Sequence, residues 1–463
     1  MAGTREPEKK TRKGKSPNTV GGEILAALGK KLGLDDDVQP LLQDPTGRTF
    51  VYNGRFWEEL SKHSFKALVY EHHPASRNSF REEVMHYLNA ACHRRDHKWE
   101  RVADHEVPCE NGVVDVRTGK LRPHRPEDYL ESIIPWPWDA SADPSEALEA
   151  YLLSCFGELD VERPGALQEF AGYVLMAHAR LKKAFFGQGP KDTGKSQYAL
   201  LLKLMVGSDQ ACVLPVEAMD DPVRMAAIVG KRLNVLTELK SDAMIRDGGF
   251  KQLVSTEEPI EVNPKYVPSF AYTPICKHVI IANDLPQIND RTSATVERLL
   301  IVPFTRVIPK EEQDPDLQKK FAAEMPGILR WAVAGARRLI EQRGQFSKVE
   351  LSEAKIQQIR EESNALIGFL RQMAKKEEGA AIPLNDLVAA FNKWKGGGKA
   401  ADVRQVGKLA RAAFGDEATG VAWNPAAKSS ASSLLGWRLR DVSEQPGEYA
   451  KTWQVGEAPA DEA

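Results

Sequence analysis

A glycine-rich segment near the middle of the chain, residues 189–196, contains residue types that bind phosphate groups. It has the pattern G-x-x-x-x-G-K-S. In such a loop, successive backbone N–H groups surround the phosphates of a nucleotide, the lysine reaches the β- and γ-phosphates, and the final hydroxyl binds Mg²⁺. The segment therefore predicts an ATP site that comprises Gly189, Pro190, Lys191, Asp192, Thr193, Gly194, Lys195 and Ser196, with Ser196 as a ligand of Mg²⁺.

The residues on either side of this segment favour the same interpretation. Residues 184–186 are an apolar run suited to a buried strand, and residues 197–205 carry apolar side chains at helical spacing. A strand, a glycine-rich turn and a helix together direct N–H groups and the positive end of the helix at an anion. The alternative is a glycine- and lysine-containing turn that arose by chance, and such a turn does not require these neighbours.

Two later apolar runs end in polar residues that suit phosphate chemistry. Residues 233–236 are followed by Thr237 and Glu238, and residues 277–282 are followed by Asn283. A strand-end carboxylate can hold Mg²⁺ or polarise the attacking water, and an amide there can bind the γ-phosphate or orient that water. Many strands end in a glutamate, so the carboxylate supports this interpretation only together with the glycine-rich loop.

An arginine precedes a further apolar run. Arg298 follows the polar stretch 290–297 and stands before residues 299–304. An arginine in this position can reach the nucleotide of a neighbouring subunit as an arginine finger, which neutralises charge in the transition state. The alternative is that Arg298 forms an ordinary surface salt bridge. The finger role is favoured only because the glycine-rich loop and the two polar strand ends occur in the same chain.

The composition narrows the class of protein. The 463 residues include 63 Lys and Arg and 65 Asp and Glu, a net charge of −2, so contact with nucleic acid must come from local patches. No apolar run approaches the roughly 18–20 residues that span a bilayer, and no apolar segment follows the basic N-terminus, so a secretory signal is not expected. Five scattered cysteines without a C-x-x-C pair are typical of reduced thiols, and we expect a cytoplasmic protein.

Most of the histidines lie between residues 63 and 105. His93 and His97 would share one face if this stretch were helical, and a metal site is then conceivable. Solvated or core histidines are the favoured alternative, because the carboxylate and cysteine spacing of known sites is missing.

The pattern along the chain predicts several units. We expect a disordered basic tail over residues 1–20, a mixed α+β domain over 21–150, an α/β core over 151–345, a helical linker with a small C-terminal domain over 346–445, and a disordered tail over 446–463. Asn53-Gly54 predicts a hairpin with a type I′ turn. Two helices over 384–394 and 403–414, separated by a glycine-rich break and followed by a terminal hairpin, suit a winged helix, with a plain helical cap as the alternative.

The order of four motifs, G-P-K-D-T-G-K-S, T-E-L, H-V-I-I-A-N-D-L-P and E-R-L-L-I-V-P-F, resembles that of superfamily 3 helicases. The chain is most similar to the helicase half of phage and plasmid primase-helicases, including the satellite-phage and poxvirus type. The resemblance covers about residues 45–445 and includes the segments 111–115, 170–175 and 324–331. It implies a P-loop AAA+-like superfamily 3 ATPase core in an α/β fold, an N-terminal α+β helicase-associated domain and a C-terminal winged-helix-like domain.

The resemblance also implies roles for single residues. Lys195, Glu238, Asn283 and Arg298 would be catalytic, with ATP and Mg²⁺ as cofactors and Mg²⁺ held at Ser196 and Glu238. The family's channel-lining hairpin corresponds to residues 250–266, so Lys251, Lys265 and Tyr266 would contact DNA, Lys265 through a phosphate. Two departures are a Ser-Thr-Glu-Glu stretch at 255–258, where the family usually has a Ser-Gly-Asp-like turn, and Glu297-Arg298, where it tends to have paired arginines.

These features predict an ATP-dependent, ring-forming DNA helicase that acts in replication of a phage, plasmid or other mobile element. We expect a homo-oligomer, a hexamer by the resemblance, that binds single-stranded or forked DNA and no membrane. We also expect no primase domain of its own, so a separate primase or replication initiator is a possible partner. The alternative is an ATP-regulated DNA-binding initiator or scaffold that does not processively unwind DNA.

Overall fold

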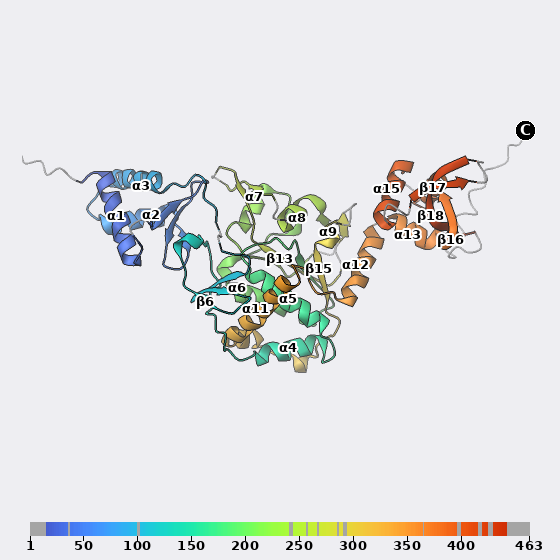
Figure 1. The fold of residues 1–463 in the computed structure, drawn as a ribbon, viewed down its shortest axis with the longest axis horizontal. Helices are drawn as coiled ribbons and strands as arrows, with labels where there is room; N and C mark the ends of the chain where they lie inside the picture. The colour runs from blue at the N-terminus through green and yellow to red at the C-terminus, as the bar shows by residue number, and fades with distance from the viewer. Residues whose placement is uncertain are drawn as a thin grey trace, which may run out of the picture.

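The computed structural model describes residues 15–35, 38–99, 102–239, 244–255, 258–265, 268–284, 287–289, 294–363, 365–395, 400–414, 419–424 and 429–441. Figure 1 shows an N-terminal unit, a central unit built around a parallel sheet, and a C-terminal unit joined to the centre through helix α12 (Glu350–Ser363). Within the described ranges, no helix is both long enough and apolar enough to cross a membrane.

The N-terminal unit combines helices with two antiparallel sheets. Its elements are α1 (Pro17–Leu32), β1 (Leu41–Gln43), β2 (Thr49–Tyr52), β3 (Trp57–Glu59), α2 (Lys62–His72), α3 (Asn78–Cys92), β4 (Glu106–Cys109), β5 (Gly112–Asp115) and β6 (Leu121–Arg122). The strands pair in the orders β1-β2-β3 and β4-β5-β6. Val20, Ile24 and Leu28 recur at helical spacing and are buried in one cluster with Val84 and Leu88 of α3, so α1 and α3 pack through apolar faces.

The expected extent of the disordered N-terminal tail is wrong in detail. Residues 17–20, expected to belong to the disordered tail, are helical: the Ser16 hydroxyl accepts the Thr19 N–H at 3.3 Å, and Pro17 stands in the first turn, where a missing N–H costs nothing. Residues 1–14 of the predicted tail lie outside the described residues.

The Asn53-Gly54 hairpin forms, but not with a type I′ turn. Tyr52 pairs with Trp57, so four residues connect the strands, and only Gly54 of these has a positive φ, of +93°. The Asn53 carboxamide oxygen accepts the N–H groups of Arg55 and Phe56 at 3.1 and 3.0 Å. These side-chain bonds stabilise a longer turn than the dipeptide alone predicts.

The less favoured alternative for His93 and His97, a shared helix face, does not occur. Helix α3 ends at Cys92, and His93 takes an extended backbone with φ −66° and ψ 130°. The His97 ring packs edge-on against Trp99 and Tyr129. Among the described residues, no group of three or more His, Cys, Asp or Glu side chains is placed to hold a metal ion.

The central sheet has the strand order β15-β7-β13-β9-β8, and all four neighbouring pairs are parallel. The strands are β7 (Ala184–Gln188), β8 (Ala211–Cys212), β9 (Leu233–Leu236), β13 (Lys277–Ala282) and β15 (Leu299–Pro303). They alternate between two apolar clusters: Phe185 belongs to one and Phe186 to the other. Since successive side chains of a strand point to opposite faces, this sheet is covered on both sides, as parallel sheets require.

Helices cover the two faces of this sheet (Figure 1). On one face lie α4 (Glu146–Phe156), α5 (Glu162–Leu175), α6 (Lys195–Val206), α10 (Leu317–Ala323) and α11 (Met325–Glu341), and on the other α7 (Pro222–Met225), α8 (Asp247–Val254) and α9 (Ala294–Glu297). The same side as α8 carries two small sheets, β10 (Met244–Arg246) with β14 (Gln287–Asn289), and β11 (Ile260–Val262) with β12 (Phe270–Tyr272). Val107, Val114 and Ile134 are buried with the α5 and α6 side chains, so this part of the N-terminal region shares the central core.

The C-terminal unit has its own core. Its elements are α13 (Ala365–Met373), β16 (Ala374–Pro383), α14 (Leu384–Lys395), α15 (Val403–Phe414), β17 (Thr419–Asn424) and β18 (Ser429–Leu439), with the antiparallel sheet order β16-β18-β17. Phe369, Phe391, Val406 and Leu434 are buried together in it. Both helices predicted here are present; the glycine-rich break at 396–399 and the predicted tail at 446–463 lie outside the described residues.

Candidate functional site

The glycine-rich loop lies between the end of β7 and the start of α6, as the sequence pattern predicts. Gly189 begins the loop at a close backbone approach: a Cβ there would lie 1.9 Å from the carbonyl oxygen of Phe304. The Phe304 N–H donates to the Gln188 carbonyl at 2.6 Å, which holds the residue after β15 against the end of β7. A side chain at position 189 would therefore push the loop off the sheet.

A second glycine closes the loop at the start of α6. Gly194 has φ +85°, and a Cβ there would lie 2.4 Å from the Cys155 sulfur. The Tyr151 hydroxyl donates to the Gly194 carbonyl at 3.0 Å, and the Ile308 N–H donates to the Asp192 carbonyl at 2.7 Å. Helix α4 and the chain after β15 thus fix the loop from two sides.

Lys195 lies inside the loop. Its side chain is buried, and its Nζ donates to the Pro190 carbonyl at 2.5 Å, an oxygen that also accepts the Thr193 hydroxyl at 3.0 Å. Burial lowers the pKa of the Lys195 ammonium, and the nearby Asp192 carboxylate opposes that shift. Ser196 is exposed in the first turn of α6. A buried ammonium, a helix N-terminus and an exposed hydroxyl at one place are the groups that a polyphosphate with Mg²⁺ requires.

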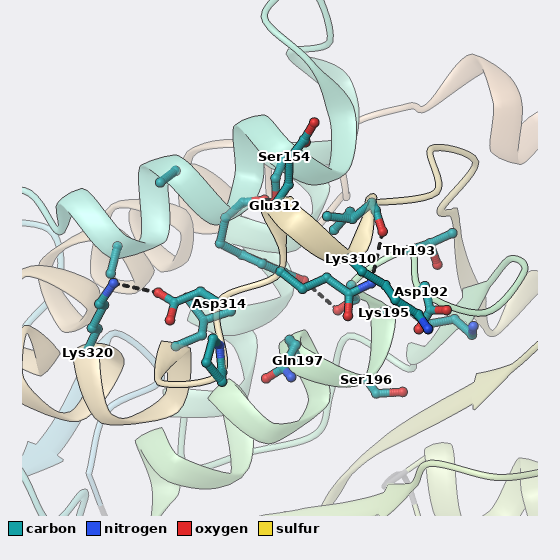
Figure 2. Close-up of a pocket in the computed structure, with 18 of the residues that line it drawn as sticks. Ser154, Asp192, Thr193, Lys195, Ser196, Gln197, Lys310, Glu312, Asp314 and Lys320 are labelled. Atoms are coloured by element: carbon teal, nitrogen blue, oxygen red, sulfur yellow. Dashed lines mark hydrogen bonds and ion pairs between the residues drawn. The ribbon is translucent and has the colours of Figure 1, made fainter.

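A cavity of about 970 Å³ opens beside this loop. Its walls are α4, the loop from Asp192 to Gln197, the chain from Ile308 to Leu317, and α10. Figure 2 shows Lys310, Glu312 and Asp314 among the residues that line this cavity, with Lys320 ion-paired to Asp314 at 2.6 Å. The volume lies at the upper end of the range for sites that take small molecules and nucleotides.

The residues on the far walls of this cavity were not predicted from the sequence. Tyr151 and Ser154 precede the loop by about 40 residues, and Lys310 and Glu312 follow it by more than 100. No spacing rule connects positions so far apart. Only the covering of the loop by α4 and by the chain after β15 brings them together.

Asn283 lies beside the loop strand. Ala282 pairs with Gln188 in the parallel sheet, and the Gln188 side-chain amide donates to the Asn283 carbonyl at 2.8 Å. Since parallel strands end at the same edge, Asn283 and the loop share the edge at which ligands bind in such sheets.

Glu238 stands farther from the loop on the same edge. Leu236 pairs with Ile280, so β13 separates the strand that precedes Glu238 from β7. Glu238 is exposed and lines a separate cavity of about 310 Å³ together with Val213 and Glu217. The structure therefore does not bring Glu238 into the cavity that Lys195 and Ser196 line.

Arg298 lies at the opposite edge of the sheet from the loop. Its carbonyl accepts the N–H of Ala184, the first residue of β7, whereas the loop begins after the last residue of that strand. A five-residue strand is about 16 Å long, at roughly 3.3 Å per residue. Arg298 is therefore remote from the loop of its own chain.

The predicted DNA-contacting residues fall on two elements. Strands β11 and β12 form an antiparallel hairpin in which Val262 pairs with Phe270, and Lys265 is exposed in its connection. Lys251 lies in α8 instead and is partly buried. Tyr266 lies outside the described residues. The loop end of the hairpin contacts the N-terminal unit, since the Arg48 guanidinium stands 5.7 Å from the centre of the Phe270 ring.

Comparison with known proteins adds independent findings. Residues 40–157 match the family described as D5 N terminal like, and residues 188–298 match a family of unknown function, DUF5906. The chain is 26% identical over 233 residues to a protein named "Putative helicase 121R" of Invertebrate iridescent virus 3, a match that covers 46% of this chain and 24% of that protein. The chain therefore spans about a quarter of the length of this curated relative.

Solved structures resemble the chain over most of its length. Two apo structures of the NrS-1 C-terminal region match with TM-scores of 0.52 and 0.54, both at 13% identity. They cover 92% and 91% of this chain, and in both cases all of the solved chain. At this identity the likeness shows the fold alone. The matched family regions, the viral relative and the shared fold make the chain similar to phage-type helicase/primase-like proteins.

Proposed function

We propose that this protein is an ATP-dependent DNA helicase that works as a ring of identical subunits in replication of a phage, plasmid or other mobile element. The observation that carries the proposal is the loop from Gly189 to Ser196, which follows a central parallel strand, encloses the Lys195 ammonium and borders a cavity large enough for a nucleotide. In this proposal residues 151–345 form a P-loop AAA+-like superfamily 3 core.

The reaction would be the attack of water on the γ-phosphate of ATP. Lys195 would bind the β- and γ-phosphates, and Asn283, beside the loop, would contact the γ-phosphate or orient the water. Ser196 would hold Mg²⁺ directly, and Glu238, which lines a separate cavity, would hold it only through water; Mg²⁺ neutralises phosphate charge when bound. Because Glu238 stands one strand beyond Asn283, we expect its carboxylate to act on the water or on Mg²⁺ through water rather than by touching the phosphates.

The position of Arg298 supports a ring. A cation at the far edge of the sheet cannot reach the loop of its own chain, so a finger role requires a neighbouring subunit. A head-to-tail contact that places one subunit's Arg298 at the next subunit's cavity closes into a cyclic assembly. We propose a hexamer, with Lys265 on the β11–β12 hairpin contacting single-stranded DNA in the channel.

The C-terminal unit fits a winged-helix-like domain. Its element order, α13-β16-α14-α15-β17-β18, places helices before a terminal hairpin, and β16 joins that hairpin in one antiparallel sheet. This arrangement contains a three-stranded sheet, which the alternative from the sequence, a plain helical cap, would lack.

The test is ATP hydrolysis and strand separation on a fluorescent forked duplex, measured for the wild type and for Lys195→Ala. Lys319→Ala is the matched control: it removes a lysine whose side chain is 85% exposed on α10. We expect both activities to be lost in Lys195→Ala and kept in the control, since the loop lysine typically contributes several kcal/mol to the transition state. Hydrolysis without strand separation would favour an initiator or scaffold instead. Wild-type turnover by Lys195→Ala would refute the site.

A further inference from the structure

The chain that follows β15 carries four cations between residues 306 and 320, and one of them differs from the others. Three form ion pairs with nearby carboxylates, at N–O distances from 2.6 to 3.5 Å: Arg306–Glu312, Lys319–Asp316 and Lys320–Asp314. The fourth cation is Lys310. Within the part of the chain that the structure describes, its ammonium group forms no ion pair or hydrogen bond.

The backbone fixes Lys310 close to the glycine-rich loop. The Ile308 N–H donates to the Asp192 carbonyl at 2.7 Å, and the Ile308 carbonyl accepts the Gln313 side-chain amide at 2.9 Å. Lys310 then begins a 3₁₀ turn that ends at Glu312. Two extended residues span at most about 7 Å, so the Lys310 Cα lies within about that distance of a residue that is bonded to the loop.

Lys310 lines the same cavity as Asp192, Thr193 and Lys195 (Figure 2). The lining contains five carboxylates, on Glu146, Asp192, Glu312, Asp314 and Glu324. It contains three ammonium groups, on Lys195, Lys310 and Lys320, so negative charge is in excess by two. Because Asp314 neutralises Lys320, only Lys195 and Lys310 among these three lysines are available to an anionic ligand.

A nucleoside triphosphate would bring further negative charge into this cavity. Phosphate oxygens that leave water need charge-assisted hydrogen bonds in return. Lys195 supplies one ammonium group, and Arg298 is remote from the loop of its own chain. We propose that Lys310 binds the phosphate chain of the nucleotide, as a second cation from the same subunit. The inference rests on the proposed ATP site and adds to it a residue from outside the loop.

The rest of the lining favours a different place for the base. Ala147 and Ala150 on α4 and Leu317 at the start of α10 give the cavity an apolar wall. Such a wall suits a flat nucleobase, whereas an ammonium group forms its strongest hydrogen bonds with anionic oxygens. Since the segment of Lys310 is bonded through Ile308 to the loop that would hold the phosphates, we assign Lys310 to the phosphates rather than to the base.

The experiment is isothermal titration calorimetry of the full chain with Mg²⁺ and two probes. One probe is a non-hydrolysable ATP analogue, and the other is inorganic tripolyphosphate, which has the phosphate chain without base or ribose. Lys310→Gln removes the charge, and Lys310→Arg keeps it. Lys319→Gln is the matched control, because it removes one charge from the same segment at a side chain that is 85% exposed and outside the cavity lining.

We expect Lys310→Gln to bind both probes on the order of tenfold more weakly, the effect of one lost hydrogen bond to a charged group. The fold-loss should be the same for the two probes, because the contact is to phosphate. Lys310→Arg should recover most of the affinity, and the control should match the wild type.

Three results would overturn the inference: unchanged affinity in Lys310→Gln, a loss for the ATP analogue without a loss for tripolyphosphate, or an arginine variant that binds no better than the glutamine variant. The second result would place Lys310 at the base or the ribose. Lys195→Ala separates this failure from failure of the proposed function. If the wild type binds the ATP analogue and Lys195→Ala binds it more weakly, an unchanged Lys310→Gln overturns the role of Lys310 alone. A wild type that binds neither probe would overturn the proposed ATP site together with this inference.

Discussion

Acid should destabilise the central sheet through His278. This residue lies on β13 and its side chain is 1% exposed. Its Nδ1 lies 3.1 Å from the Asn234 Nδ2 on the neighbouring strand β9. The Asn234 amide cannot turn round, because its oxygen accepts the Leu214 N–H at 2.7 Å and its nitrogen donates to the Leu214 carbonyl at 3.1 Å. His278 Nδ1 must therefore accept a hydrogen bond, which only the neutral ring can do on that side.

The size of the effect follows from the pKa of His278. Burial lowers it from 6.5 to about 4. Above pH 6.5 the His278 ring is neutral in both the folded and the unfolded state, so its titration does not lower the free energy of unfolding. As the pH falls from 6.5 towards 4, His278 becomes protonated in the unfolded chain but stays neutral in the folded chain, and the free energy of unfolding therefore falls. At about 1.4 kcal/mol per pH unit, the loss is about 2 kcal/mol at pH 5 and about 3 kcal/mol below pH 4.

The measurement is the free energy of unfolding in urea at pH 7, 6 and 5, for the wild type and for His278→Asn. Asparagine does not titrate, and its oxygen can accept the same hydrogen bond from Asn234. Other groups, His178 among them, titrate in both proteins, so the difference between the two curves isolates His278. The wild type should lose about 2 kcal/mol more than the variant between pH 7 and pH 5. Parallel curves would refute the reasoning, even if the variant is less stable at every pH.

Further predictions concern DNA contact and the subunit interface. Lys265→Ala should weaken single-stranded DNA binding and flatten its log–log salt slope by about 0.7, with basal ATP hydrolysis kept; an unchanged slope would move the contact elsewhere. Arg298→Ala should bind ATP through its own loop yet lose on the order of 10³–10⁵ in hydrolysis rate, the range of known fingers. Mixing it with Lys195→Ala should restore part of the activity, because each variant supplies what the other lacks. No recovery in mixed rings confirmed by native mass spectrometry would exclude a finger in trans.

Short stretches of sequence were sufficient to predict the phosphate-binding loop, the strand before it and the helix after it. The glycines at 189 and 194, the apolar run of β7 and the first turns of α6 act within a few residues of one another. The positive φ of Gly194 is a local requirement that glycine meets by itself, whereas the close approaches at Gly189 and Gly194 involve Phe304 and Cys155, which lie far along the chain. The strands before Glu238 and Asn283 were predicted for the same reason, because an apolar run followed by a polar residue indicates where a buried strand ends.

Turn and tail patterns in the sequence were less reliable where a polar side chain forms hydrogen bonds with the nearby backbone. The Asn53-Gly54 dipeptide indicates a tight turn, yet the Asn53 carboxamide captures two N–H groups and lengthens it. The composition of the basic tail predicts disorder, yet Ser16 and Pro17 start a helix whose apolar face then packs on α3. In both cases a polar side chain next to the end of a strand or the start of a helix forms hydrogen bonds with nearby backbone N–H groups and sets the local structure.

Tertiary structure alone decided the spatial relations between the motifs. The strand order sets Asn283 next to the loop and Glu238 one strand farther, and parallel pairing carries Arg298 to the opposite edge. The walls of the cavity, among them Tyr151 and Lys310, come from segments about 40 and 115 residues from the loop. Periodicity and motif spacing describe residues that are neighbours along the chain, whereas strand order and helix packing follow from burial of apolar faces across the whole domain. The sequence therefore determined which groups are available for chemistry, and the packing of the domain determined which of them meet.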